Sequence, residues 1–282
     1  MAASSRSDQS GDKVKITLTG AQETMLAALV CRARDAKMPE PVLNDTWACQ
    51  VLEQIDHDVD KFGIDDSQAI MHVLRARCLD RWVTDFLRHN AQATVVHLAC
   101  GLDTKCLRLP WGSEVRWIDL DMPDVVDLRR KLLPSPDGDY QLVAADVADD
   151  AWLEKIPADR PTLIIAQGLL MYLDEPTGKR LIQRLVDHFK TGQLVVDFVG
   201  SIILTLQGYI KTLKATAATF KWGVNDPKEL EALHTQLKMM DCLRPAELDG
   251  FEKVPFVTRL ILNVYWYLPR LRNLSFYVRY RF

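Results

Sequence analysis

The stretch "TVVHLACGLDTKCLRLP", residues 94–110, decides the fold. Its first six residues form an apolar, β-branched run of the length typical of a buried strand, and Gly101 and Asp103 follow directly. Similar apolar runs recur at 115–120, 140–147, 161–168 and 193–200, and candidate helices lie between the runs at 103–109, 123–133, 151–156 and 174–190. Strands that alternate with helices form right-handed βαβ units, so the sequence predicts an α/β protein with a parallel, Rossmann-like sheet.

The segments on either side of this core have other patterns. Residues 1–15 are small and polar and predict a disordered start. Residues 16–90 predict a helical lid, with helices at 19–37, near 47–55 and at 67–89, and with Thr19 and Gln22 as a capping box for the first of them. Residues 91–200 form the sheet core. Residues 201–282 predict substrate-cap helices at 201–220 and 225–237 and antiparallel closing strands in the tail 259–282, as one structural unit with the core.

Composition excludes several classes of protein. A net charge of −3 leaves no excess of positive charge for binding nucleic acid. The amino terminus lacks the apolar stretch of a secretory signal, and Asp197 interrupts the most apolar later segment, so we expect neither secretion nor a membrane partner. The six cysteines include no C-x-x-C pair, which indicates reduced core thiols rather than disulfides or a metal site. A cytoplasmic globular protein is therefore expected.

Each of the first four predicted strands ends in a polar or glycine-containing turn. The residues there are Gly101 and Asp103 for the first strand, Asp119 and Asp121 for the second, Asp146 for the third, and Gln167 and Gly168 for the fourth. The carboxyl ends of parallel strands meet at one edge of the sheet, where such folds bind ligands. A glycine there lets a ligand lie against bare backbone, and an acid about twenty residues later can accept hydrogen bonds from ribose hydroxyls. This pattern predicts a nucleoside site.

The turn at 99–104 favours one nucleoside cofactor over another. The dinucleotide fingerprint G-x-G-x-x-G reads here as Ala-Cys-Gly-Leu-Asp-Thr, so two of its three glycines are missing. We also expect the acid at 103 to repel a pyrophosphate. A zwitterionic amino-acid tail and a sulfonium tolerate nearby acids, which favours S-adenosylmethionine over NAD. An NAD-dependent oxidoreductase remains the alternative at the level of the fold.

Several motifs together resemble the leucine carboxyl methyltransferase family, in particular its branch that acts on polyketides and other secondary metabolites. The motifs are "RARCLD" (75–80), "LACGLDTKCLRL" (98–109), "WIDLDMPDVVDLRRKLL" (117–133), "QGLLMYL" (167–173) and "FKWGVNDPKELE" (220–231). The resemblance implies a class I O-methyltransferase that depends on S-adenosylmethionine.

The resemblance also implies a role for each matching residue. Arg75 would meet the methionine carboxylate, and Gly101 and the backbone around Ala99 would pass beneath the methionine. Asp121 would bind the ribose, with Asp119 as the alternative. The set is completed by Asp146 and the Val147 amide at the adenine and by Gln167 at the cofactor's amino group. Three features depart from the family's pattern: Ala99 with Cys100, Lys105 in place of Arg, and Gln167 in place of Glu. A catalytically silent scaffold is the alternative that these departures leave open.

The acceptor substrate leaves a weaker signal. None of the six histidines forms a pattern that marks a general base, so the catalytic residues stay unassigned; His72 is assigned to a helix surface and His97 to the core. Tyr172 and Trp222 are the candidate substrate contacts. The lid and residues 201–250 are apolar and aromatic, which favours a hydroxyl, or alternatively a carboxyl, of a small polyketide- or terpenoid-type metabolite. Methylation of a protein's terminal carboxylate is the second possibility.

Overall fold

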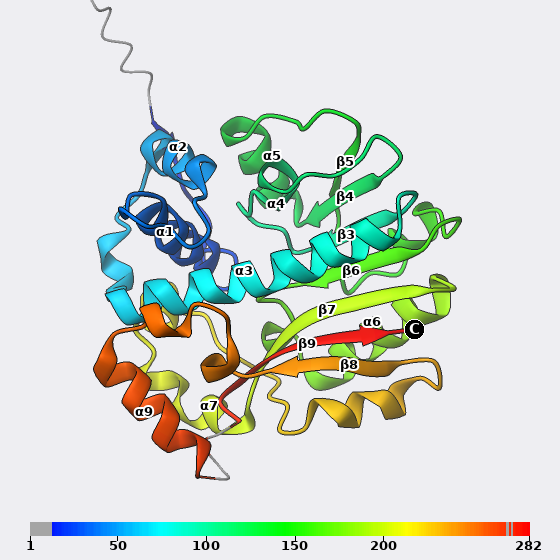
Figure 1. The fold of residues 1–282 in the computed structure, drawn as a ribbon. Helices are drawn as coiled ribbons and strands as arrows, with labels where there is room; N and C mark the ends of the chain where they lie inside the picture. Colours follow the sequence, from blue (N-terminus) through cyan, green and yellow to red (C-terminus); the bar gives the residue numbers. More distant parts are fainter. Residues whose placement is uncertain (1–12, 269–270, 272) are drawn as a thin grey trace, which may run out of the picture.

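A seven-stranded sheet forms the centre of the molecule (Figure 1). The structure is a computed structural model that describes residues 13–268, 271 and 273–282, so the predicted disordered start falls almost wholly outside the described residues. The strands lie in the order β5-β4-β3-β6-β7-β9-β8. Their bounds are β3 Thr94–Leu98, β4 Arg116–Asp121, β5 Asp139–Ala144, β6 Thr162–Ala166, β7 Gly192–Val199, β8 Lys238–Leu243 and β9 Ser275–Arg281. The first five strands are parallel, and β9 and β8 complete one edge in antiparallel pairing, which confirms the predicted fold class.

The strand order creates a crevice at the carboxyl ends of the strands. From β3 the chain moves outward to β4 and β5, and then crosses to the other side of β3 to form β6 and β7. Leu98 of β3 therefore pairs with Leu120 of β4 on one side and with Ala166 of β6 on the other. Connections that leave neighbouring strands in opposite directions open a space between them, so the turns after β3 and β6 mark the expected ligand site.

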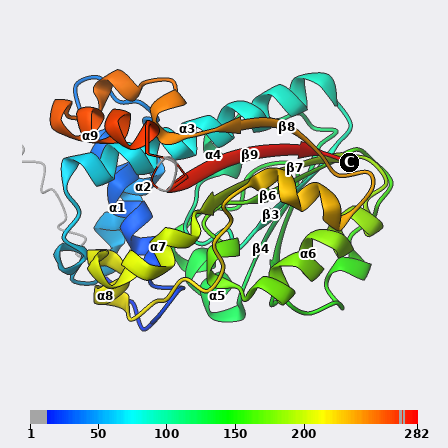
Figure 2. The same cartoon turned by 90° about the horizontal axis from the view of Figure 1, so that it is seen from below.

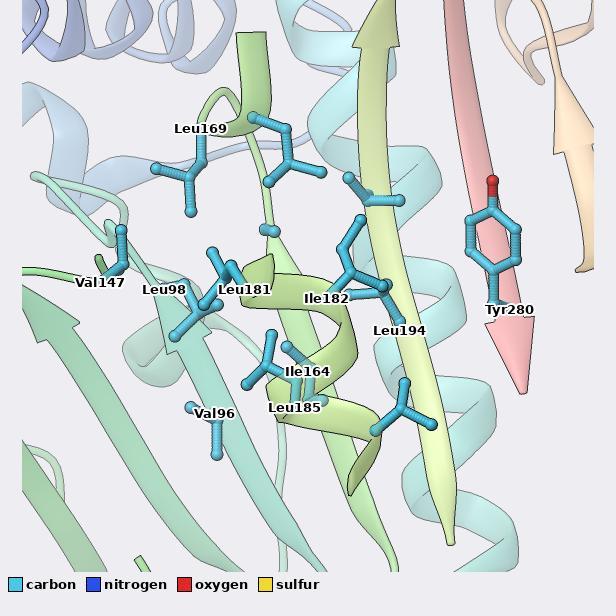
Figure 3. Close-up of a cluster of buried hydrophobic side chains, with 14 of the residues drawn as sticks. Val96, Leu98, Val147, Ile164, Leu169, Leu181, Ile182, Leu185, Leu194 and Tyr280 are labelled. Atoms are coloured by element: carbon cyan, nitrogen blue, oxygen red, sulfur yellow. The ribbon is translucent and has the colours of Figure 1, made fainter. Parts of the chain in front are cut away.

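Helices cover both faces of the sheet. Val96 and Leu98 of β3 belong to a core cluster with α6 (Glu175–His188), and Figure 3 shows Leu181 and Leu185 of this helix directed at the strands. Val95, on the opposite face, packs in a second cluster with α3 (Asp66–His89). Both faces are covered, so the strands are apolar on each side, as is typical of a parallel sheet.

Further helices gather where the parallel strands end. Figures 1 and 2 both place α1, α2, α7 and α9 on that side of the sheet. Residues of α1 and α2 share a core cluster with residues of α5, which follows β4. The bounds are α1 Thr24–Ala36, α2 Thr46–Gln54, α5 Pro123–Leu132, α7 Ser201–Leu206, α8 Lys211–Thr216 and α9 Phe256–Trp266. The other described elements are β1 Val14–Lys15, β2 Ile55–Asp56, α4 Lys105–Arg108 and short 3₁₀ turns.

The first helix begins later than predicted. The expected capping box at Thr19 and Gln22 is wrong, because α1 begins at Thr24. Gly20 has a left-handed φ of +63°, which a helix cannot continue through. The Gln22 side chain instead donates a hydrogen bond to Asp124 Oδ1 at 2.7 Å. The helix expected at 174–190 is α6, and Asp174 caps it, since its side chain accepts from the Thr177 amide.

The carboxyl-terminal third departs further from the prediction. The helix expected at 201–220 is divided into α7 and α8, because the backbone of Ile210 is extended. The helices expected at 225–237 and 151–156 are 3₁₀ turns at Pro227–Leu233 and Leu153–Lys155, and strand β8 was not predicted. The expectation of strands in the tail 259–282 is wrong for its first part, which lies in α9, and correct for β9; residues 269–270 and 272 of the tail lie outside the described residues.

The structure also bears on the state of the cysteines and on the presence of membrane-spanning helices. All six cysteines are free thiols, and Cys31, Cys78, Cys100 and Cys106 are buried, in agreement with the prediction of reduced core cysteines. None of the helices in the described part of the chain combines the length and the apolar character that crossing a membrane requires.

Candidate active site

A cavity of about 500 Å³ lies at the carboxyl ends of the parallel strands. This volume is within the range of roughly 300–1,000 Å³ that is typical of small-molecule sites. One half, here called the strand-end half, is formed by the residues that follow β3, β4, β5 and β6. The other, the helical half, is formed by α1, α3, the segment around α8, and Phe220; residues of β7 and β9 also line the cavity. Of the ten residues given a cofactor or substrate role from the sequence, eight line the cavity: Arg75, Ala99, Gly101, Asp121, Asp146, Val147, Gln167 and Tyr172.

The two acids of the second strand have different environments. Asp121 lines the cavity, and its carboxylate accepts hydrogen bonds from the Gly101 amide at 2.7 Å and the Met122 amide at 2.8 Å. Burial raises the pKa of Asp121 above its ordinary value, although these amides oppose the shift. Each carboxylate oxygen keeps a second lone pair, so Asp121 can still accept a hydrogen bond from a ligand.

Asp119 lies beneath the cavity and is fully buried. Its Oδ2 is 2.7 Å from Nη2 of Arg129, and the side chains of Trp117 and Tyr140 donate hydrogen bonds to its carboxylate. Burial alone would raise the pKa of Asp119, but the Arg129 guanidinium and the hydrogen bonds outweigh it and hold the pKa below its usual range. The geometry therefore gives Asp119 a role inside the fold, and Asp121 is the acid presented to the cavity.

The turn after β3 has an unusual backbone. Ala99 and Gly101 have φ values of +49° and +51°, in the left-handed region that costs an alanine roughly 1–2 kcal/mol. A Cβ on Gly101 would meet the Met25 side chain at 3.1 Å. Gly101 is thus required by its own φ and by the approach of α1, in addition to the predicted closeness to a ligand.

A buried lysine connects two strand ends. Lys105 is fully buried, and its Nζ lies 2.9 Å from Asp80 Oδ1, 3.2 Å from Asp103 Oδ2 and 3.0 Å from Gln167 Oε1. Arg108 also contacts Asp103, at 2.6 Å. Burial alone would raise the pKa of Asp103, but Arg108 and Lys105 hold it well below its usual range. Lys105 and Arg108 balance the negative charge of Asp103, so the expectation that Asp103 repels a pyrophosphate is not supported.

Helix α3 brings Arg75 to the cavity wall, where it contacts two residues that had no predicted site role. Arg75 Nη1 lies 3.0 Å from Asp197 Oδ2, and its Nη2 lies 3.2 Å from His72 Nδ1. Both partners line the cavity, so the assignment of His72 to a helix surface is wrong. Asp197 had left one signal in the sequence, because an acid in the middle of the apolar run "LVVDFVG" requires a buried partner.

The remaining predicted site residues are those at the end of the third strand and the two candidate substrate contacts. Asp146 and Val147 line the cavity, and Asp146 Oδ1 accepts from the Ala148 amide at 2.8 Å. Tyr172 also lines it, donates to Thr24 Oγ1 at 3.1 Å and packs edge-on against Phe220. The structure places Trp222 elsewhere: it is 5% exposed and packs in the core among residues of α6 and β7, so its position does not support contact with a substrate.

Comparisons with known proteins agree with this geometry. A model of the leucine carboxyl methyltransferase family matches residues 24–186, more than half of the chain. The chain belongs to this family. The tetracenomycin polyketide synthesis O-methyltransferase TcmP of Streptomyces glaucescens is 41% identical over 217 residues, which cover 77% of this chain and 80% of that protein. The S-adenosyl-L-methionine-dependent methyltransferase dpfgK of Gibberella zeae is 41% identical over 240 residues, with coverage of 78% and 80%.

Solved structures show the same fold at low sequence identity. A DUF574 family protein from Streptomyces avermitilis superposes with a TM-score of 0.57 at 12% identity, over 90% of this chain and 96% of that one. A structure from Thermobifida fusca gives a TM-score of 0.55 at 18% identity, over 89% and 94%. As a member of the leucine carboxyl methyltransferase family, the protein is a methyltransferase, and the prediction of S-adenosylmethionine as its cofactor is confirmed. The oxidoreductase alternative is overturned.

The residues present fit this cofactor. The strand-end half presents a carboxylate for ribose hydroxyls at Asp121. At the boundary with the helical half, Arg75 Nε is buried and has no hydrogen-bond partner among the described residues. A buried donor without a partner is costly, so this atom suits an anionic group of a ligand such as a carboxylate.

Proposed function

We propose that the protein transfers the methyl group of S-adenosylmethionine to an oxygen atom of an apolar small molecule of polyketide or terpenoid type. The division of the cavity is the observation that carries this proposal. The strand-end half gathers the polar residues that suit a nucleoside, whereas the helical half adds the apolar side chains of Met25, Ile210, Leu213 and Phe220 beside polar ones such as His72 and Arg75. A set of apolar side chains beside a nucleoside site suits an apolar acceptor.

We assign to the ribose, adenine and carboxylate contacts the residues that the resemblance implies. In this proposal Asp121 accepts hydrogen bonds from the ribose, Asp146 and the Val147 amide meet the adenine, and Arg75 meets the methionine carboxylate. The cofactor supplies a methyl group that is already activated by a sulfonium, so the chain has to align the acceptor oxygen and exclude water. The helices α1 and α8 contribute residues to the helical half and so limit the access of water there.

The side chains that line the cavity restrict the kinds of acceptor oxygen that are expected to react. Burial, assisted by the charge of Arg75, lowers the pKa of His72 to about 3, so this imidazole is a weak base at neutral pH. Its Nδ1 must accept from Arg75, because a guanidinium has only donors. Burial raises the pKa of Tyr172, and His97 is 1% exposed beside Asp119. These observations favour an oxygen that ionises without help, that of an acidic phenol, enol or carboxylic acid, over an aliphatic alcohol.

Transfer of an isotopically labelled methyl group tests the proposal. The purified protein is incubated with methyl-labelled S-adenosylmethionine and a panel of phenolic, enolic, carboxylic and aliphatic-alcohol polyketides, and the labelled products are then treated with base. An ester releases labelled methanol, whereas an ether survives. Labelling of phenols or enols with base-stable products is expected for the hydroxyl acceptor, and released methanol would assign a carboxyl acceptor instead. Labelling of aliphatic alcohols alone would contradict the inference that the acceptor oxygen ionises without a general base.

A further inference from the structure

Asp197 is a buried carboxylate at the end of the last parallel strand. It lies in β7, is 3% exposed and lines the cavity. Its Oδ1 accepts a hydrogen bond from the Gly168 amide at 2.6 Å, and its Oδ2 accepts one from Arg75 at 3.0 Å. An ionised carboxylate is costly to bury unless it is paired, and these two partners leave it with further lone pairs to offer a ligand.

Arg75 and Asp197 form a pair of opposite charges beside the cavity. Two of the three guanidinium nitrogens of Arg75 are engaged, by Asp197 and by His72, and Nε is the one left without a partner in the described part of the chain. The pair thus presents a free donor on its positive member and a free acceptor on its negative member. An amino-acid zwitterion carries the complementary arrangement, a carboxylate and an ammonium on one carbon.

Gln167 is poorly suited to bind the ammonium. Its Oε1 accepts from Lys105 Nζ at 3.0 Å, and since a lysine ammonium has only donors, this contact fixes the amide with its oxygen toward the cation. The amide NH₂ group, directed away from the lysine, cannot accept a hydrogen bond. A second ammonium at the same oxygen would also lie close to Lys105 and be repelled.

The other cavity-lining carboxylates that the structure describes are committed elsewhere. Asp103 is paired with Lys105 and Arg108. Asp121 and Asp146 follow β4 and β5, whereas Arg75 is in contact with β7. We propose that Asp197, and not Gln167, binds the amino group of the cofactor's methionine, and that the Arg75–Asp197 pair recognises the zwitterion as a unit. This assignment rests on the proposed cofactor site.

Three probes separate the parts of the ligand. S-adenosylhomocysteine has the whole zwitterion, its 2-deamino analogue lacks only the amino group, and 5′-methylthioadenosine lacks the amino-acid portion. Calorimetry measures the Kd of each probe for the wild type, Asp197→Asn and Gln167→Ala. The wild type is expected to prefer S-adenosylhomocysteine over the deamino analogue by about 10- to 100-fold, the range for a hydrogen bond to a charged group.

The proposal requires that Asp197→Asn abolishes this preference while its Kd for methylthioadenosine stays within about twofold of the wild type, and that Gln167→Ala keeps the preference. It is overturned if Asp197→Asn retains the preference, or if Gln167→Ala loses it. Equal weakening of all three probes by Asp197→Asn would also overturn it, because Asp197 would then only maintain the shape of the cavity. Failure of the wild type to bind any probe would overturn the cofactor site itself.

Discussion

Replacement of Gly101 by alanine tests the account of the turn after β3. The new side chain would have to adopt φ of +51°, at roughly 1–2 kcal/mol, while the reduced freedom of the unfolded chain returns about 0.4–1 kcal/mol. Its Cβ would also lie 3.1 Å from Met25 Cβ and 3.3 Å from Met25 Sδ, and overpacking of this kind costs about 1–3 kcal/mol. The free energy of unfolding is therefore expected to fall by roughly 1–4 kcal/mol.

Two other glycines separate strain from steric contact. Gly20 has φ of +63° with no described atom within 4 Å of an added Cβ, so Gly20→Ala carries the strain alone. Gly112 has neither feature, and Gly112→Ala should be neutral or slightly stabilising. Urea unfolding at constant m-value gives the three free energies. The steric part should be partly recovered by Met25→Ala in the Gly101→Ala background, as a double-mutant cycle measures. If Gly101→Ala costs no more than Gly20→Ala, the contact with Met25 has no energetic weight.

Three further predictions follow from the site. The pKa of His72 is lowered to about 3 in the native state from an ordinary value of 6.5, so the unfolded state takes up a proton first as the pH falls. The free energy of unfolding should therefore decrease between about pH 6.5 and pH 3, by at most about 1.4 kcal/mol per pH unit. His72→Gln should flatten this slope, and equal slopes for the variant and the wild type would contradict the buried neutral imidazole. Asp119→Asn should cost about 3–5 kcal/mol of stability, because Arg129 stays buried without its carboxylate; a cost below about 1 kcal/mol in urea unfolding would refute this. Asp121→Asn should cost less, about 1–3 kcal/mol, because an asparagine can accept from only one of the Gly101 and Met122 amides, and it should weaken S-adenosylhomocysteine binding about 10- to 100-fold by calorimetry. The reverse result for the two acids would exchange their roles.

The sheet could be predicted because its signals are local. Each parallel strand is a short β-branched run, and the cap at Asp174 depends on residues within one turn. The secondary structure of the tail was harder to predict, for a physical reason. The segment of α9 is rich in β-branched and aromatic residues, which are typical of strands, and Phe256, Leu260 and Val264 are all at least half exposed, so its composition favoured a strand although the chain is helical there.

The strand-end residues of the site could be predicted from the sequence, whereas the residues that they contact could not. The turns after β3, β4, β5 and β6 all reach the cavity, because parallel strands must end on the same side. The choice between Asp119 and Asp121 depended on Arg129, whose contact with Asp119 exists only in the folded chain. Asp197 was missed for the same reason, since its partner Arg75 is 122 residues away.

The two departures at Lys105 and Gln167 are physically one change, because the side chains are in contact. Lys105, Arg108 and Arg32 supply three positive charges to this buried cluster, and Asp80, Asp103 and Asp45 supply three negative ones. A glutamate at 167, the residue that the resemblance implies there, would add a fourth negative charge and leave one unbalanced to attract an ammonium. With glutamine the cluster is balanced by its own residues and has no charge to spare. The counter-charge for the cofactor's ammonium must then come from outside the cluster, and among the cavity-lining residues that the structure describes, Asp197 beside Arg75 is the carboxylate in position to supply it.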